Sequence, residues 1–242
     1  MRVALVTGAA GGIGRATVSR LVADDYAVLA LDVRAEVSAL AADRVAPFVA
    51  DVRDRVALDA AVAQLLDTHG RLDAVVAAAA VMRAGRPLWE TDPADLDELL
   101  DVDTKGIWNT AAATIPAMLA GPDPSGCRFV AVASAAGHRG MFGLTAYTVA
   151  KHGVVGLVRG LAADLVGTGV TASAVSPGST RTPMLDDTAA AYGLSDVEEF
   201  APHQLLRRLI EPEEVAAALA FCCSREGAVV NGSVVHADGG FG

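Results

Sequence analysis

The chain has 242 residues and a formal net charge of −10, with 29 acidic against 19 basic side chains. Because nucleic acids and anionic membranes bind basic surfaces, we expect neither as a partner of so acidic a chain. A hydrophobic fraction of 52% excludes global disorder. No apolar run approaches the roughly 18 residues that span a bilayer. The first residues enter a strand pattern directly, so we expect a cytoplasmic protein.

Cysteine and histidine usage gives no sign of a metal centre. The three cysteines, Cys127, Cys222 and Cys223, form no paired framework, and two of them are adjacent. The five histidines are scattered and do not show zinc-ligand spacing. We therefore expect no metal.

Short apolar runs alternate along the chain with longer segments of helical periodicity. The expected strands are, in chain order, residues 3–6, 27–31, 47–50, 72–80, 128–133, 170–175 and 233–236. The expected helices are residues 12–24, 35–42, 54–69, 92–119 and 145–166, with a last helix from Glu211 onward. Strands that are apolar throughout are buried on both faces, so this order predicts an α/β fold with a parallel sheet covered by helices on both sides.

The segment from Thr180 to Arg208 breaks this alternation. It is irregular in pattern, mixes polar with apolar residues, and contains Pro183, Gly193 and Pro202. We expect it to be a mobile segment next to the substrate.

A glycine-rich turn joins the first strand directly to the first helix. Gly8, Gly12, Ile13 and Gly14 lie in this turn. A dinucleotide pyrophosphate rests on backbone N–H groups at such a helix start, where a Cβ atom would collide with it. The position of the turn therefore predicts a dinucleotide site.

Acidic residues at the ends of the next two strands indicate which dinucleotide binds. Asp32 ends the second strand, where a carboxylate accepts both ribose hydroxyls of NAD and repels a 2′-phosphate. Arg34, two residues after Asp32, is the one residue that argues against NAD and for NADP. NAD(H) is favoured, and NADP(H) stays open. Asp51, followed by Val52, can approach the adenine amino group or be an ordinary turn residue.

A serine, a tyrosine and a lysine form a candidate catalytic set. Tyr147 and Lys151 are four residues apart and share one face of a predicted helix. The ammonium favours phenolate, which lowers the pKa of Tyr147 from its ordinary value near 10 toward working pH. Tyr147 is then usable as a general acid/base. Ser134 follows the fifth strand, where its hydroxyl can bind the same substrate oxygen.

Together these motifs resemble the classical short-chain dehydrogenase/reductase family over essentially the whole chain. The matching residues are Thr7–Gly14, Ser134, Tyr147, Lys151, Pro177, Gly178, Asn231, Gly232 and Asp238–Gly240. The resemblance implies one doubly wound, Rossmann-type domain over residues 1–242 with about seven parallel strands. It also implies NAD(P)-dependent interconversion of an alcohol and a ketone, commonly by a homotetramer.

The resemblance implies roles for individual residues. Tyr147 exchanges the hydroxyl proton, Lys151 holds the nicotinamide ribose and lowers the pKa of Tyr147, and Ser134 positions the carbonyl. The further residues expected along the cofactor are Ala78, Ala79, Pro177, Gly178, Thr180 and Thr182.

The chain departs from the family pattern at two places. The family usually has Asn-Asn-Ala-Gly after the fourth strand, where this chain has Ala77 to Ala80, so side-chain hydrogen bonds are lost there. The family's fourth catalytic residue is an Asn, and Asp103 aligns with it. An ionised Asp accepts hydrogen bonds but cannot donate them. We expect it to accept from a relay water and to raise the pKa of Lys151 if the two are close.

Apolar residues after the strand ends suggest the substrate. Ala136, Met141, Phe142, Met184 and Tyr192 suit a hydrophobic or alicyclic alcohol, or they close a lid or pack between subunits. The leading hypothesis is an NAD-dependent alcohol dehydrogenase. The alternatives are an NADPH-dependent 3-oxoacyl or carbonyl reductase and an NAD-binding sensor with little turnover. An external redox partner also stays open.

Overall fold

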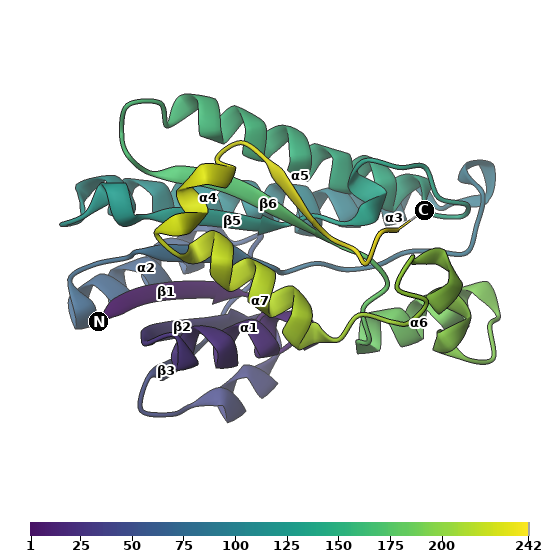
Figure 1. Cartoon of the computed structure of the whole chain (residues 1–242), viewed down its shortest axis with the longest axis horizontal. Coiled ribbons are helices and arrows are strands. Elements are labelled where there is room, and N and C mark those ends of the chain that lie inside the picture. The colour runs from purple at the N-terminus through teal and green to yellow at the C-terminus, as the bar shows by residue number, and fades with distance from the viewer. Residues whose placement is uncertain (242) are drawn as a thin grey trace.

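Seven parallel strands form one sheet in this computed structural model, which describes residues 1–241 (Figure 1). Gly242, the last residue of the predicted domain, lies outside the described residues. The strands are β1 (Arg2–Thr7), β2 (Tyr26–Asp32), β3 (Val45–Val49), β4 (Ala74–Ala77), β5 (Arg128–Val132), β6 (Thr171–Pro177) and β7 (Val234–Ala237). Their order across the sheet is β3-β2-β1-β4-β5-β6-β7.

Helices connect the strands and cover both faces of the sheet. The α-helices are α1 (Gly12–Ala23), α2 (Arg55–His69), α3 (Pro93–Leu99), α4 (Gly106–Ala120), α5 (Thr145–Asp164), α6 (Pro183–Tyr192) and α7 (Pro212–Cys223). The short 3-10 helices are η1 (Ala35–Leu40), η2 (Leu88–Glu90), η4 (Pro124–Gly126), η5 (Ala135–Gly137), η6 (Val197–His203) and η7 (Glu226–Val230). One π-helical turn, η3 (Leu100–Lys105), joins α3 to α4.

Two apolar cores lie on the two faces of the sheet. Leu21 of α1 and Leu219 of α7 pack with Val6 and Val28 on one face. Leu65 of α2, Met118 of α4 and other residues of α2, α4 and α5 pack on the other face. The central strands are buried on both sides, which is why their sequences are apolar throughout. The predicted doubly wound α/β fold is confirmed.

The strand order reverses direction between β1 and β4, which places a crevice at their carboxyl ends. Such a switch point is where open α/β sheets bind ligands, because the loops on its two sides separate there. Figure 1 shows α6 beyond this end of the sheet, apart from the two helical layers.

Three predicted elements differ from the observed ones. The fourth strand ends at Ala77 and not at Ala80, because the N–H groups of Ala78 and Ala79 donate to Thr7 Oγ1 instead of continuing the ladder. The expected helix over residues 92–119 is interrupted by η3. Residues 180–208, predicted to be irregular, contain α6 and η6.

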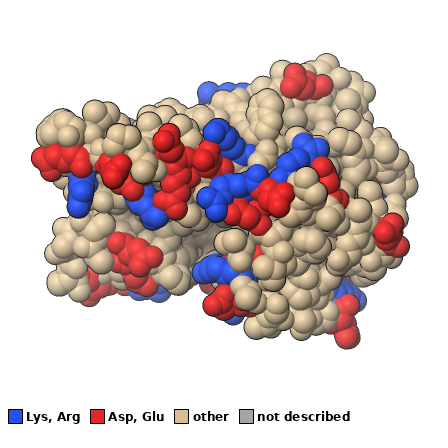
Figure 2. All heavy atoms as spheres, turned by 180° about the vertical axis from the view of Figure 1, so that it is seen from behind, with Lys and Arg blue, Asp and Glu red and all other residues tan. Residues whose placement is uncertain are grey.

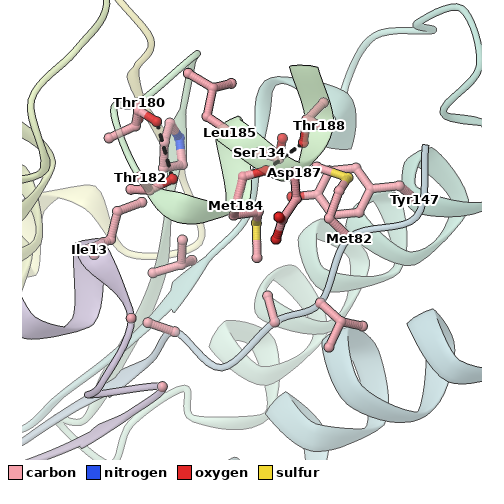
Figure 3. Close-up of a pocket in the computed structure, with 18 of the residues that line it drawn as sticks. Ile13, Met82, Ser134, Tyr147, Thr180, Thr182, Met184, Leu185, Asp187 and Thr188 are labelled. Carbon is pink, nitrogen blue, oxygen red and sulfur yellow. Dashed lines mark hydrogen bonds between the residues drawn. The ribbon is translucent and has the colours of Figure 1, made fainter. Parts of the chain in front are cut away.

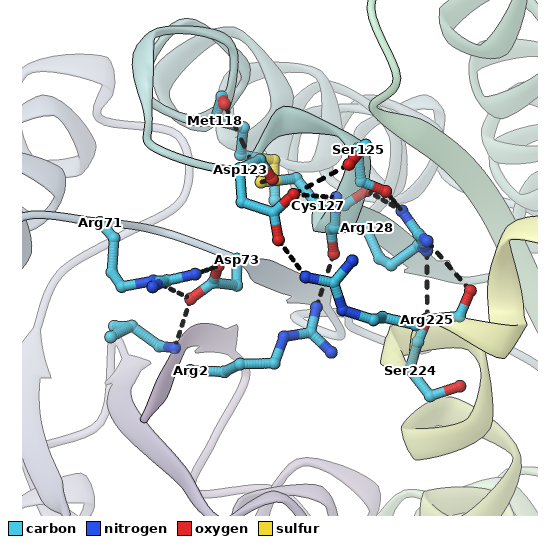
Figure 4. A network of polar contacts seen from close by, with 12 residues as sticks. Arg2, Arg71, Asp73, Met118, Asp123, Ser125, Cys127, Arg128, Ser224 and Arg225 are labelled. Carbon is cyan, nitrogen blue, oxygen red and sulfur yellow. Dashed lines mark hydrogen bonds and ion pairs between the residues drawn. The ribbon is translucent and has the colours of Figure 1, made fainter.

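The amino-terminal edge of the sheet is closed by a network of ion pairs and hydrogen bonds (Figure 4). Arg71 Nη2 lies 2.6 Å from Asp73 Oδ1, and Asp73 Oδ2 accepts the N–H of Val3 at 2.8 Å. Arg128 donates to the carbonyl oxygens of Ser224 and Arg225 at 3.1 Å each. These contacts tie α7 to the start of the sheet, at the end opposite the crevice.

Acidic and basic side chains are interspersed on the face seen in Figure 2. Many arginines are paired with a nearby carboxylate, as in Arg55–Asp59 and Arg208–Glu214. Within residues 1–241, none of the helices combines the length and the apolar character that a membrane crossing requires.

Candidate active site

A cavity of about 1290 Å³ opens at the carboxyl ends of the strands. Its wall brings together residues from across the sequence, and every predicted cofactor residue lies on it. These are Gly8, Gly12, Ile13, Gly14, Asp32, Asp51, Val52, Ala78, Ala79, Tyr147, Lys151, Pro177, Gly178, Thr180 and Thr182. Ser134 lies on the wall as well, so the cavity extends from the glycine turn to the candidate catalytic set.

The glycine turn is packed so closely that side chains do not fit. Gly8 has a φ of +68°, and a Cβ there would lie 2.7 Å from the backbone of Ala78 and Ala79. A Cβ on Gly14 would overlap the carbonyl oxygen of Gly8. The turn therefore runs flat against the end of β4 and leaves backbone groups at the start of α1 facing the cavity. This is the shape that a dinucleotide pyrophosphate requires.

Replacing Gly14 by Ala is expected to weaken dinucleotide binding about tenfold or more, because the turn must move away from α1 to admit the methyl group. Titration of the purified variant with NAD(H) measures the change. Gly140→Ala is the matched control, since a Cβ at Gly140 meets no atom within 4 Å. Equal affinity of the two variants would show that the turn does not form the cradle.

Asp32 is fixed at the end of β2 and is 5% exposed. Its Oδ2 accepts the N–H of Ala10 at 2.9 Å, and its Oδ1 accepts the N–H of Arg34 at 3.0 Å. Arg34 Nε lies 3.2 Å from the same Oδ1, while half of the Arg34 side chain is exposed. A ribose diol has to share Asp32 with this guanidinium or displace it.

The loop after β3 is held by two contacts. Arg53 Nη2 lies 2.6 Å from Asp51 Oδ2, and hydrogen bonding from Arg53 holds the pKa of Asp51 below its ordinary value. Asn109, which does not align with the family's catalytic Asn, donates from Nδ2 to the carbonyl oxygen of Val52 at 3.1 Å. Asp51 therefore lies on the cavity wall already paired with the Arg53 guanidinium.

Tyr147 and Lys151 project together from the start of α5, as their four-residue spacing predicts. Both are buried, at 5% and 1% exposed. Lys151 Nζ lies 5.5 Å from the centre of the Tyr147 ring and donates to the carbonyl oxygen of Val132 at 3.3 Å. Ser134 follows β5, and its Oγ accepts the N–H of Ala136 at 3.2 Å. The tyrosine and serine hydroxyls thus reach the cavity from two neighbouring elements.

Asp103 lies beneath this set and is completely buried. The π-helical turn η3 directs it inward, where its Oδ2 lies 3.2 Å from Lys151 Nζ. Its Oδ1 accepts the N–H of Val81 at 2.8 Å. Asp103 is not on the cavity wall, so it acts on the cavity through Lys151.

Burial controls the ionisation of this group. Burial raises the pKa of Tyr147, and the lowering influence of Lys151 does not outweigh it. The expectation that Lys151 brings the pKa of Tyr147 down from its ordinary value is therefore wrong for this structure, because burial outweighs the lysine charge and the Asp103 carboxylate adds to the rise. Burial alone would lower the pKa of Lys151, but the Asp103 carboxylate raises it, as expected. Burial also raises the pKa of Asp103.

The other half of the cavity is mostly apolar. Met141, Phe142, Met184 and Tyr192 lie on its wall. Ala136 does not, because it is completely buried and packs with Leu99, Leu144, Tyr147 and Ala150. Met82 packs against the cluster of buried residues that contains Tyr147, and Figure 3 shows Met82, Met184 and Ser134 among the residues around the cavity.

Two wall residues that the sequence does not single out are Asp187 and Phe241. Asp187 of α6 points toward the cavity in Figure 3 and adds a carboxylate to an apolar wall. Its orientation depends on α6, which was expected to be irregular. Phe241 reaches the wall from the chain after β7, and its ring centre lies 6.2 Å from that of His203. No local pattern distinguishes Phe241, because it is carried there by the glycine pair that precedes it.

Comparison with known proteins decides the family. The family model described as enoyl-(acyl carrier protein) reductase matches residues 8–242. The chain belongs to the short-chain dehydrogenase/reductase family. The short-chain reductase protein NovJ of Streptomyces niveus is 36% identical to it over 98% of this chain and 93% of the relative.

Solved structures of the family have the same fold. The crystal structure of levodione reductase superposes with a TM-score of 0.91 at 31% identity, over 98% of this chain and 96% of that one. The 3-ketoacyl-(acyl-carrier-protein) reductase of Brucella melitensis complexed with NADH superposes with a TM-score of 0.88 at 25% identity. The match covers 99% of this chain and 97% of that one. Members of the family bind NAD(P)(H).

Proposed function

We propose that this short-chain dehydrogenase/reductase is an NAD-dependent oxidoreductase that interconverts a hydrophobic or alicyclic secondary alcohol and its ketone. The proposal rests on one observation: Ser134, Tyr147 and Lys151 line a cavity that is continuous with the glycine turn. This arrangement places a proton-transfer group beside the position that the dinucleotide cradle implies.

The protein's part in the reaction is positioning and proton transfer. When bound, the nicotinamide supplies or accepts the hydride. The Ser134 and Tyr147 hydroxyls hold the substrate oxygen, and Tyr147 gives it a proton in reduction or takes one in oxidation. Lys151 keeps a positive charge beside the Tyr147 ring, and Asp103 keeps Lys151 protonated. The apolar wall orients the substrate carbon and excludes water.

The preference for NAD(H) rests on Asp32, whose carboxylate repels a 2′-phosphate. Replacing Asp32 by Ala is expected to reduce the preference for NAD(H) over NADP(H) about tenfold or more, because a hydrogen bond to a charged group is lost. Affinities for both dinucleotides, measured on the wild type and the variant, give the preference. Asp67→Ala, on the exposed surface of α2, is the control.

One observation supports a second candidate, an NADPH-dependent 3-oxoacyl or carbonyl reductase. The Arg34 guanidinium lies close to Gly11, at 3.7 Å from where a Cβ would stand. It can meet a 2′-phosphate there if it leaves Asp32. The likeness to a 3-ketoacyl reductase agrees with the substrate class of this candidate, but not with its cofactor, because that structure holds NADH. An Arg34→Ala variant that loses NADPH binding and keeps NADH binding would favour it.

The experiment that tests the proposal begins with the ligand released from purified protein. Its mass and spectrum are measured, and the stripped protein is titrated with NAD(H) and NADP(H) and assayed on alcohols and ketones. Reversible NAD(H) binding with turnover supports the proposal. Tightly held NAD(H) indicates an external redox partner that reoxidises the cofactor. If the protein binds NAD(H) but turns over none of the substrates, the proposal is wrong and the NAD-binding sensor takes its place.

We also propose a homotetramer, which is common in the family. Trp108 of α4 is 65% exposed in the single chain, and Val149 of α5 is 48% exposed. Large apolar side chains on these two neighbouring helices suit contacts between subunits. Light scattering during size-exclusion chromatography measures the number of subunits.

A further inference from the structure

Two histidines and an aspartate meet at the carboxyl ends of β5 and β7, and none of the three lines the cavity. His138 directly follows η5, His236 lies in β7, and Asp238 follows β7. One donor atom from each lies within 4.8 Å of the other two. The rings of His138 and His236 are 4.4 Å apart between centres and nearly perpendicular.

We propose that His138, His236 and Asp238 bind a divalent transition-metal ion of the zinc type. Two imidazole nitrogens and one carboxylate oxygen are a donor set that zinc takes in proteins, with a fourth position left for water. The half-exposed side chain of His236 leaves this position open to solvent. The site differs from the dinucleotide and substrate positions proposed above, and it does not depend on them.

The first support is a buried donor atom that lacks a partner. The Nδ1 atom of His138 is buried and has no hydrogen-bond partner among the described residues. Such an atom is costly unless it is satisfied by something that the polypeptide does not supply. A neutral imidazole with a free ring nitrogen is the form that binds metal ions.

The second support is the orientation of Asp238. Its Oδ1 accepts the N–H of Gly240 at 3.0 Å, which fixes the carboxylate. The other oxygen, Oδ2, is then directed at His236, with Nδ1 of that ring 3.5 Å away. Two donors bound to one tetrahedral zinc ion at about 2.1 Å stand about 3.4 Å apart, so this pair is already at ligand spacing. A small rotation of the histidine rings brings the third donor in.

An ion at this position would connect two parts of the cavity wall. His138 ends the η5 turn that begins after Ser134, and Asp238 is followed by the tail that carries Phe241. The backbone of Asp238 also lies close to Gly178, since a Cβ on Gly178 would stand 2.8 Å from its carbonyl oxygen. The expected role of the ion is therefore structural: it fixes the Ser134 turn against the tail.

The test uses the 242-residue chain after treatment with a chelator, titrated with Zn²⁺ by calorimetry. We expect one ion per chain and a rise in Tm of about 5 °C or more at saturating Zn²⁺. His236→Gln is expected to weaken binding at least about tenfold and to abolish the rise in Tm. His69→Gln, an exposed histidine at the end of α2, is the matched control and should behave as the wild type.

His138→Gln is the second variant, and it should match His236→Gln. Co²⁺ in place of Zn²⁺ provides a spectroscopic check, because nitrogen and oxygen ligands give no thiolate charge-transfer band. A thiolate band would assign the ion to a cysteine. Equal Zn²⁺ affinity in the wild type and in both variants, or no binding by folded wild type, would overturn the proposal.

Discussion

Replacing Tyr147 by Phe is expected to lower kcat about 10²–10⁴-fold, because the variant has no group to exchange a proton with the substrate oxygen. The phenyl ring keeps the packing against Leu99, Leu144 and Ala150, so the fold and the cavity should be retained. The affinity for NAD(H) should change little. The measurement is steady-state kinetics on any substrate that the wild type turns over, with NAD(H) titration of the same preparation.

Tyr26→Phe is the matched control for this prediction. Tyr26 is also buried, but its hydroxyl donates to the carbonyl oxygen of Cys223 at the opposite end of the sheet. This variant should keep its turnover. If Tyr147→Phe retained wild-type kcat, another group would have to carry the proton, and the proposed mechanism would be wrong.

Asp103→Asn is expected to move the pH profile of alcohol oxidation to lower pH. Oxidation requires Tyr147 as phenolate, and the Asp103 carboxylate raises the pKa of Tyr147. Removing this negative charge lowers that pKa, so phenolate forms at a lower pH. The measurement is kcat/KM against pH, which reports ionisation of the free enzyme. An unchanged profile would remove Asp103 from the mechanism.

Asp103→Ala should also lower the free energy of unfolding, by about 3–5 kcal/mol, since it leaves the buried Lys151 ammonium without its partner. Denaturant unfolding of the wild type and the variant measures the difference. Asp101→Ala is the matched control, because Asp101 lies in the same turn and also pairs with a lysine, Lys105, but at the surface. The loss of unfolding free energy in Asp101→Ala should be much smaller, because solvent screens a surface ion pair.

Much of the fold was predictable because each central strand is apolar throughout and most helices have a clear stripe of apolar residues along one face. The positions of Asp32 and Ser134 followed from the same pattern, since both lie where a strand ends. The irregular structure expected for residues 180–208 was wrong, because the segment contains α6 and η6. Pro183 stands at the first position of α6 and Gly193 caps it with a φ of 70°, and both were interpreted as loop residues. Proline at a helix start and glycine at its end are helix boundary signals.

The electrostatics of the site could not be read from spacing. The four-residue spacing of Tyr147 and Lys151 places the two on one helix face, and that prediction was correct. The spacing contains no information about burial, which raises the pKa of Tyr147. Nor does it show the distance from Lys151 to Asp103, which lies on a different helix and comes close only in the folded chain.

Because η3 is a π-helical turn, the number of residues in the segment from α3 through η3 to α4 matters as much as which residues they are. A π-turn holds one residue more than the α-helical turn it replaces. Deleting a single residue between Leu100 and Lys105 would let α3 and α4 join as one regular helix. One side of the junction would then rotate by about 100° against the other. Asp103 and the contacts of α3 with α5 could not both stay in place, so this helix can accept substitutions far more readily than deletions or insertions.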